Sequence, residues 1–455
     1  MSEHNPTLVR TLGLRSVVLF GLAYMTPLIV LGIFGIVAEV TAGATPSAYL
    51  AALVAMIFTA WSYGRMSAAY PVAGSAYTYV RKTIDSRMGF IVGWAILLDY
   101  VFLPFVIWLF GAVYLQAQFP DVPFWVWIMM FIVLTTIINI LGIRVAAKAN
   151  FLLMAFQILV IVIFVMLSLA HVFASDGATG WFSTNPFSGV DSNFSMISAG
   201  AAIAAYSFLG FDAVTTLTEE TVDARKTIPK AIMLTAIIGG AIFIIVAYTT
   251  QLVHPGAAFD DSASASFEIA KVIGGSFFSS LFLAGVVIAQ FSSGISAQAS
   301  ASRLMYAMGR DHVLPHRFFG FVQEKYRTPM LNILLIAVIG LFALKFDPAT
   351  STSFINFGAF VAFSFVNISV IAYFLRQRGS GERLNPFGYI VVPVIGAAID
   401  IYLLTQLDSN AIRLGLVWLA LGIVYLAFLT KGFRKAPPEM EFSEEAEAEE
   451  PVHGG

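Results

Sequence analysis

The chain of 455 residues contains no cysteine and few charged residues. It can therefore form no disulfide, no thiolate metal site and no thiol nucleophile. Charged residues make up 11% of the sequence and hydrophobic residues 58%, with a mean hydropathy of +0.84. A soluble protein could not bury that much apolar surface, so the composition indicates a membrane protein.

The sequence also lacks the motifs of several other functional classes. It has neither an HExxH nor a GxSxG motif, which argues against a membrane-embedded enzyme, and we expect no metal and no cofactor. It has no basic patch with interleaved aromatic residues, so we expect no nucleic-acid partner. A channel is conceivable, but no filter motif stands out. The short connection at 221–227 argues against the major facilitator architecture, which usually has a long central loop.

Histidine is scarce inside the apolar part of the sequence. The six histidines all lie near predicted loops, helix ends or tails, at positions 4, 171, 254, 312, 316 and 453. Any proton relay inside the membrane would therefore have to use carboxylates.

Apolar runs of membrane-spanning length recur along the whole chain. The first is too long, and has the wrong flanks, for a cleaved signal peptide. Each run is near or above the roughly 20 residues that a transmembrane helix needs. We predict an all-α membrane protein with twelve transmembrane helices, at about 14–40, 46–70, 88–118, 123–142, 146–173, 194–218, 229–253, 275–307, 329–345, 354–376, 385–407 and 410–430.

The positions of lysine and arginine predict the orientation of these helices. If the N-terminus lies inside, all but three of the 25 basic residues fall in inner segments, the exceptions being Lys271, Lys345 and Arg413. Positive charge in short loops favours the cytoplasmic side, so both termini are expected in the cytoplasm. Residues 1–13 then form a cytoplasmic N-terminal segment. Residues 431–455 are acidic and without apolar periodicity, and are expected to be a disordered cytoplasmic tail.

Two of the predicted spans contain residues that interrupt a helix. Glycines also allow close packing of membrane helices, so either interruption alone has an ordinary explanation. The two take equivalent positions, however, if spans 1–5 and 6–10 form repeats of opposite orientation, which points to a substrate site at the midplane. The interrupted segments are Gly32, Ile33, Phe34 and Gly35, after Pro27, in the first span, and Tyr206, Phe208, Leu209 and Gly210 in the sixth.

Such a site suits amines and amino acids. The positive end of a half-helix favours an anionic group, while free carbonyls at the other break accept hydrogen bonds from an ammonium. Asp99, predicted deep in the third span, is a candidate proton carrier or partner for a cationic substrate. The alternative for Asp99 is a neutral acid that is hydrogen bonded between helices. Asp400 in the eleventh span lies outside the proposed repeats and is expected to be structural.

Acidic residues also follow the second break. Asp212 and Glu219 share one helical face with a threonine between them, and Glu220 lies beside it. We predict that this face is the wall of an inner vestibule and that these acids serve coupling or gating. The alternative is that Glu219 and Glu220 lie at the cytoplasmic surface and pair with Arg225 or Lys226.

Several longer motifs identify a family resemblance. YPVAGSAYTY, FLGFDAVTTLTEET with the following IPKAI, SRLMYAMGRDHVLP, LLDYVFLP, RTPMLNI and INFGAFVAFSFVNISV resemble motifs of the amino acid, polyamine and organocation transporters. Within that group the chain is most similar to bacterial putrescine importers, from about Gly21 to Leu429.

The resemblance implies a fold and a function. The expected fold is a five-plus-five inverted repeat (LeuT-like) formed by helices 1–10 within residues 14–377, with two additional C-terminal helices within 385–430. The implied function is proton-driven uptake of a small amine across the bacterial inner membrane. Substrate would lie between the breaks at Gly32 to Gly35 and Tyr206 to Gly210, near Asp99. The expected assembly is a monomer or a homodimer.

Two departures from the family pattern leave alternatives open. The putrescine importers carry an aspartate in the first break, where this chain has Gly32, which resembles the small residues of amino acid carriers. An amino acid permease, or an amino acid or amine exchanger of the same fold, is therefore the alternative. Some proton-driven relatives place a lysine where this chain has Gln157, so Asp99 or Glu220 becomes the proton candidate. Ser293 and Ser296 leave sodium coupling open.

Overall fold

The regular elements of the computed structural model are all helical. The structure describes residues 11–71, 75–141, 147–218, 220–323, 325–326, 328–377 and 384–438. Glu219 and the ends of the expected terminal segments, 1–10 and 439–455, therefore lie outside the described residues. Isolated bridges join Leu12 to Thr221 and Gln323 to Thr328.

In the first part of the chain, two short helices follow the first helix and precede a series of longer helices. Its elements are α1 (Leu14–Met25), α2 (Ile29–Gly32), α3 (Phe34–Val40), α4 (Thr45–Ala69), α5 (Ser75–Thr83), α6 (Ser86–Gln118), α7 (Phe124–Leu141) and α8 (Ala147–Asp176). Asp85 caps α6 by accepting a hydrogen bond from the Arg87 backbone N–H. Pro104 lies inside α6.

The second part begins with short elements before another group of long helices. These elements are η1 (Gly177–Phe182), α9 (Asn185–Ser188), α10 (Phe194–Ala204), η2 (Ala205–Phe208), η3 (Asp212–Leu217), α11 (Ala224–Val253), η4 (Ser262–Ser264), α12 (Ala265–Arg310), α13 (His316–Phe319), α14 (Met330–Gly340), η5 (Leu341–Leu344) and α15 (Pro348–Gln377). The last part contains the π-helix η6 (Phe387–Val391), α16 (Val392–Thr405) and α17 (Ser409–Leu429). Gly275, with φ 65°, kinks α12 at the residue where the sequence predicts a span to begin.

Eleven helices in the described part of the chain are long and apolar enough to cross a membrane. They coincide with the predicted spans except for the one at 329–345. That segment is the shorter apolar helix Met330–Leu344, formed by α14 and η5. The prediction of an all-helical membrane protein with many spans is therefore confirmed.

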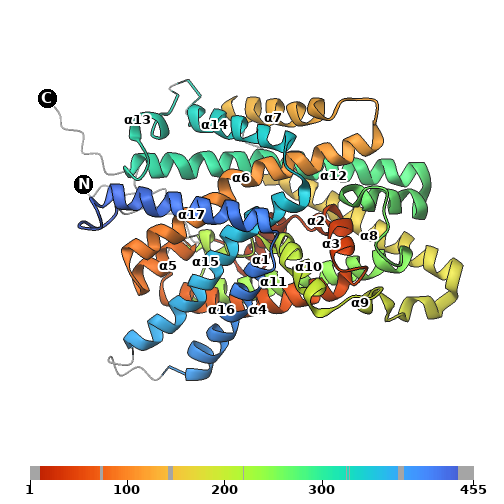
Figure 1. Ribbon diagram of the computed structural model, residues 1–455, viewed down its shortest axis with the longest axis horizontal. Coiled ribbons are helices and arrows are strands. Elements are labelled where there is room, and N and C mark those ends of the chain that lie inside the picture. The colour runs from red at the N-terminus through yellow and green to blue at the C-terminus, as the bar shows by residue number, and fades with distance from the viewer. Residues whose placement is uncertain are drawn as a thin grey trace.

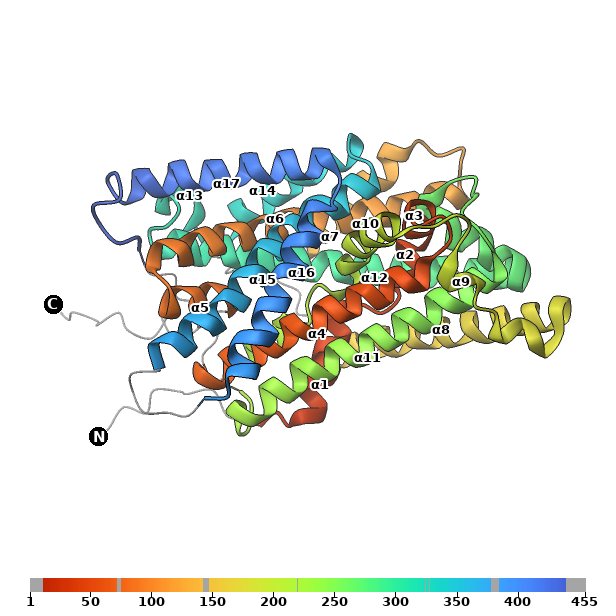
Figure 2. The same ribbon diagram turned by 60° about the horizontal axis from the view of Figure 1, so that its bottom comes forward.

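The spans differ in how much of their surface other helices cover. In the most apolar 18-residue stretch of each helix, 67% of the residues are buried in α15 but only 17% in α17. Because lipid is as apolar as the side chains it meets, the exposed apolar faces of the outer helices need no further cover in a bilayer. α4 packs along α10 and α11, and α6 packs along α12 and α15. The short α2 and α3 lie among these longer helices (Figures 1 and 2).

Candidate substrate cavity between two interrupted helices

The first interruption lies between α1 and α2. Thr26 takes a left-handed backbone conformation (φ 49°, ψ 77°), and Pro27, which has no backbone N–H, follows it. The sequence prediction centred this break on Gly32 to Gly35, but the structure places the wider break earlier, at 26–28. Only Ile33, with φ −114° and ψ 6°, separates α2 from α3.

Gly35, at the second position of α3, has a packing role. A Cβ at this position would overlap the backbone carbonyl of Ser262 and the side chain of Ala265. Phe34 lies edge-to-face against Phe259, with ring centroids 6.2 Å apart. The glycine therefore lets α3 approach the segment around η4 closely.

The second interruption lies where the sequence predicts it. α10 ends at Ala204, and Gly210 has a φ of +102°, a conformation that side-chain-bearing residues rarely adopt. A Cβ at Gly210 would also overlap the ring of Tyr24 in α1. Glycine is therefore required both by the backbone and by the contact between the two interrupted spans.

Side chains of neighbouring helices satisfy backbone carbonyls near both breaks. The Tyr114 hydroxyl of α6 donates to the Leu31 carbonyl at 2.8 Å, and the Asn356 amide of α15 donates to the Ala202 carbonyl at 2.8 Å. Such partners are needed because an unsatisfied carbonyl in a membrane interior is costly. The Tyr49 hydroxyl lies 3.2 Å from Ser207 Oγ in η2.

A cavity of about 390 Å³ lies beside the two breaks. This volume is within the range of small-molecule sites. Of the predicted site residues, Asp99, Tyr206, Leu209, Gly210 and Asp212 line it. The predicted residues that do not line it are Gly32, Ile33, Phe34, Gly35, Phe208 and Glu220.

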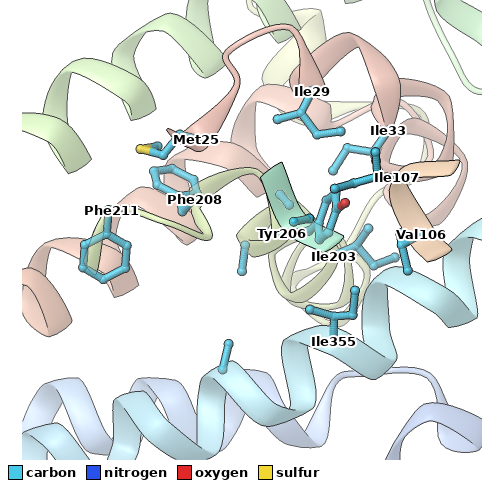
Figure 3. Packing of buried hydrophobic residues seen from close by; sticks show 14 of the residues in the cluster. Met25, Ile29, Ile33, Val106, Ile107, Ile203, Tyr206, Phe208, Phe211 and Ile355 are labelled. Atoms are coloured by element: carbon cyan, nitrogen blue, oxygen red, sulfur yellow. The ribbon is translucent and has the colours of Figure 1, made fainter. Parts of the chain in front are cut away.

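Apart from Glu220, which is half-buried, the predicted site residues outside the cavity wall are buried. Ile33, Phe34 and Phe208 are fully buried. Phe208 packs edge-to-face on Phe243, with centroids 5.1 Å apart. Figure 3 shows Phe208 beside Met25 of α1, and Tyr206 pointing toward Ile107 and Ile33. The two breaks are therefore joined by apolar packing behind the cavity, and a substrate role for the first-break residues stays a prediction.

Two carboxyl groups line the cavity. Asp212 Oδ2 accepts hydrogen bonds from the Tyr63 hydroxyl at 3.4 Å and from Ser75 Oγ at 3.5 Å. Asp99 Oδ1 is buried and has no hydrogen-bond partner among the described residues. An unpaired buried acceptor is costly, so Asp99 is an acceptor with unused capacity in the cavity wall.

The rest of the wall contains several aromatic rings and several hydroxyl groups. Sequence analysis missed Tyr24 and Tyr100, whose faces and hydroxyls suit a cation. A serine row on α12 also lines the cavity; Ser293 and Ser296 were named from the sequence, whereas Ser292, Ser300 and the nearby Gln290 were missed. The spacing of four residues between Ser292, Ser296 and Ser300 is a helical period that could have revealed one face.

The cavity opens toward the beginning of α1. Phe20 and Tyr24 line it and are each 37% exposed. α3 and η4, which pack against each other, contribute no residue to its lining.

A short backbone clasp joins the two interrupted spans at the open side. The Leu12 backbone N–H donates to the Glu220 carbonyl at 3.0 Å, and the Val222 N–H donates to the Leu12 carbonyl at 3.0 Å. Lys226, a suggested partner of the glutamates, instead pairs with Asp223 at 3.4 Å. Glu220 is thus placed beside the start of α1 by its main chain.

Asp400 lies away from the cavity, in agreement with its expected structural position. It is fully buried, and its Oδ2 accepts hydrogen bonds from Thr59 Oγ1 at 2.8 Å and from the Asn367 amide at 2.9 Å. These bonds join α16 to α4 and α15.

Comparison with known proteins identifies the family. The family model described as amino acid permease matches residues 16–408. The chain is 42% identical to the low-affinity putrescine importer PlaP of Escherichia coli (strain K12) over 434 residues, which cover 95% of this chain and 96% of that protein. It is 25% identical to the methylthioribose transporter of Bacillus subtilis (strain 168), over 93% of this chain and 94% of that protein. It is 28% identical to the branched-chain amino acid permease BcaP of Lactococcus lactis subsp. cremoris (strain MG1363), over 85% of this chain and 87% of that protein.

These relatives are transporters, which confirms the predicted family resemblance and the expectation that the chain is not an enzyme. Since the family model covers most of the chain and the importer is similar along nearly its whole length, this multi-pass membrane protein belongs to the amino acid permease family of transporters.

Proposed function

We propose that the protein imports a small amine, putrescine-like in its chemistry, across the bacterial inner membrane. The observation that carries this proposal is the charge of the cavity wall. Asp99 and Asp212 line it, and its described lining includes no lysine, arginine or histidine. A charged group in the membrane needs a partner, so a diamine supplies the positive charge that two carboxylates require.

The similarity to the putrescine importer PlaP of Escherichia coli supports the same substrate class. An amino acid substrate would also need a partner for its own carboxylate. No basic side chain among the described lining residues offers one, so the cavity favours an amine over a zwitterion.

The proposal includes coupling to protons. Asp99 has an unpaired carboxylate oxygen and lies in the cavity wall, where either a proton or an ammonium can meet it. A carboxyl group that exchanges one for the other links proton movement to substrate movement. Asp212 is the second candidate for this exchange. Glu219 and Glu220 belong to the proposed inner exit, and sodium is the alternative coupling ion.

The proposal also includes the finer architecture. We count twelve spans, with Met330–Leu344 as the ninth, and a core of residues 14–377 built as a five-plus-five inverted repeat. Both termini face the cytoplasm, so the cavity faces inward. Support comes from the matching positions of the two interruptions, in the first and sixth spans.

Uptake of labelled putrescine into proteoliposomes, with and without an imposed proton gradient, tests the function. We expect gradient-dependent uptake that unlabelled diamines inhibit and that amino acids inhibit weakly. Uptake that ignores the gradient but requires internal substrate would make the protein an exchanger. Uptake of amino acids in preference to diamines would contradict the substrate class.

A further inference from the structure

Arg65 lies near the end of α4 without an acceptor for its guanidinium. No hydrogen bond or ion pair joins it to any described residue. Other arginines do find acceptors, since Arg87 donates to the Phe433 carbonyl at 2.6 Å and Arg376 donates to the Lys82 carbonyl at 2.9 Å. A guanidinium has five N–H donors, so Arg65 has capacity for an external acceptor.

Two aromatic rings hold this guanidinium in place. Arg65 lies over the Trp61 ring, 4.5 Å from its centroid, and over the Tyr389 ring, 4.9 Å from its centroid. Trp61 Nε1 donates to the Gly388 carbonyl at 2.9 Å, and Tyr389 stacks on Tyr373. The site therefore has two fixed walls, one from α4 and one from η6.

The local backbone also suits this arrangement. η6 is a π-helix, a rare element that is frequent at functional sites. A Cβ at Gly388 would lie 3.3 Å from the Trp61 ring and 3.4 Å from Arg65 Nη2, so glycine allows the guanidinium to lie against η6. Ring faces satisfy the charge of a guanidinium but accept none of its in-plane N–H groups.

The surroundings of this site are apolar and exposed. On α4, a row at helical spacing leads to the guanidinium, made of Leu50, Val54, Phe58, Trp61 and Arg65. On η6 and α16, the exposed apolar side chains are Phe387, Val391, Val394 and Ile395. α4 and α16 pack against each other (Figure 2), so the two apolar faces belong to one region of the surface.

We propose that Arg65 binds the phosphate of an anionic phospholipid, whose acyl chains lie along the exposed row of α4 and along α16. Arginine matches the geometry of phosphate oxygens. The apolar row continues from Arg65 toward the membrane interior, as an acyl chain does from its head group. This proposal does not depend on the transported substrate.

The site favours an anionic lipid over a zwitterionic one. The ammonium of a zwitterionic head group would need a carboxylate or an open aromatic face. The described residues place no carboxylate against Arg65, and Arg65 itself occupies the ring faces of Trp61 and Tyr389 that line the site. A head group with net negative charge is therefore the complementary ligand.

Native mass spectrometry of the full chain tests the site. Protein would be purified with equal mole fractions of phosphatidylglycerol and phosphatidylcholine, as wild type and as the variants Arg65→Gln, Arg65→Lys and Arg317→Gln. Arg317 in α13 is exposed and has no ion-pair partner in the described chain, so it is the matched control. We expect Arg65→Gln to retain roughly tenfold less phosphatidylglycerol, because a hydrogen bond to a charged group is lost.

The Arg65→Lys variant and the wild-type protein provide further tests of the proposed lipid site. Arg65→Lys should retain an intermediate amount, since it keeps the charge but not the planar fork. Equal retention in wild type and Arg65→Gln would overturn the proposal, and so would equal losses in Arg65→Gln and Arg317→Gln, which would indicate general surface charge. If Arg65→Gln fails to fold, a thermal-shift measurement on the wild type tests the proposal instead. Phosphatidylglycerol should then raise its Tm more than phosphatidylcholine does, whereas glycerol phosphate without chains should not; equal shifts with both lipids would overturn the site.

Discussion

Replacing Asp99 by asparagine removes a negative charge from the cavity while keeping the size of the side chain. Asp99 lines the cavity with Oδ1, which accepts no hydrogen bond from any described residue, so changing this atom breaks no hydrogen bond of the described fold. A hydrogen bond to a charged group contributes about 1.5–3 kcal/mol. Its loss corresponds to an increase in the KM for putrescine of about 10- to 150-fold.

Initial rates of labelled putrescine uptake in proteoliposomes measure this KM. The same vesicles should be tested with butylamine, which carries one ammonium. Wild type should prefer putrescine over butylamine, and Asp99→Asn should lose most of that preference, because the second ammonium no longer finds its acid.

Asp400→Asn is the matched control. Asp400 is also a buried membrane aspartate, but it bonds Thr59 and Asn367 away from the cavity. We expect it to lower thermal stability and to leave KM unchanged. An Asp99→Asn protein with the wild-type KM and the wild-type preference for the diamine would refute the assignment of Asp99.

Three other substitutions test the surrounding structure. Gly210→Ala should reduce uptake at least about fivefold while the protein still inserts, because a strained residue costs about 1–3 kcal/mol and its Cβ displaces Tyr24; uptake at the wild-type rate would contradict this. Gly35→Ala should separate α3 from η4, so that a cysteine introduced by Ala265→Cys reacts faster with a thiol reagent in the Gly35→Ala background than in the wild-type background. An unchanged labelling rate would contradict the packing role of Gly35. Trp418→Phe removes the hydrogen bond from Trp418 Nε1 to the Trp94 carbonyl (2.8 Å) and should lower the free energy of unfolding by about 1 kcal/mol, measured by thermal denaturation against Trp125→Phe, whose side chain is exposed.

The apolar runs were enough to predict an all-helical membrane protein and nearly all of its spans, because a bilayer allows few other structures. Gly210 revealed the second break, since its positive φ is a local property of the backbone. The first interruption includes Ile33, within the predicted segment, and a wider gap at 26–28 around Pro27. Gly35 itself serves a close contact with Ser262, which is distant in sequence. From sequence alone, a glycine that permits close helix packing cannot be distinguished from a glycine that permits a positive φ.

The cavity itself was only partly predictable. Asp99 and Asp212 stood out because acids are rare within apolar spans. Tyr24 and Tyr100 did not, since tyrosine is ordinary in a membrane helix and only the packing of α1 against the second break makes it part of a wall. Tyr114 and Asn356 were missed for a related reason, because the carbonyls they satisfy belong to other helices.

The clasp between Leu12 and the residues after η3 has a mechanical consequence. Together with the Thr11 N–H, which also donates to the Glu220 carbonyl, it joins the start of α1 to the end of the sixth span through three backbone hydrogen bonds of 3.0 Å. Backbone bonds do not depend on side-chain identity, so the join tolerates substitution. The start of α1 and the segment after η3 are therefore mechanically coupled. A conformational change that moves either segment must move both together or first break these hydrogen bonds.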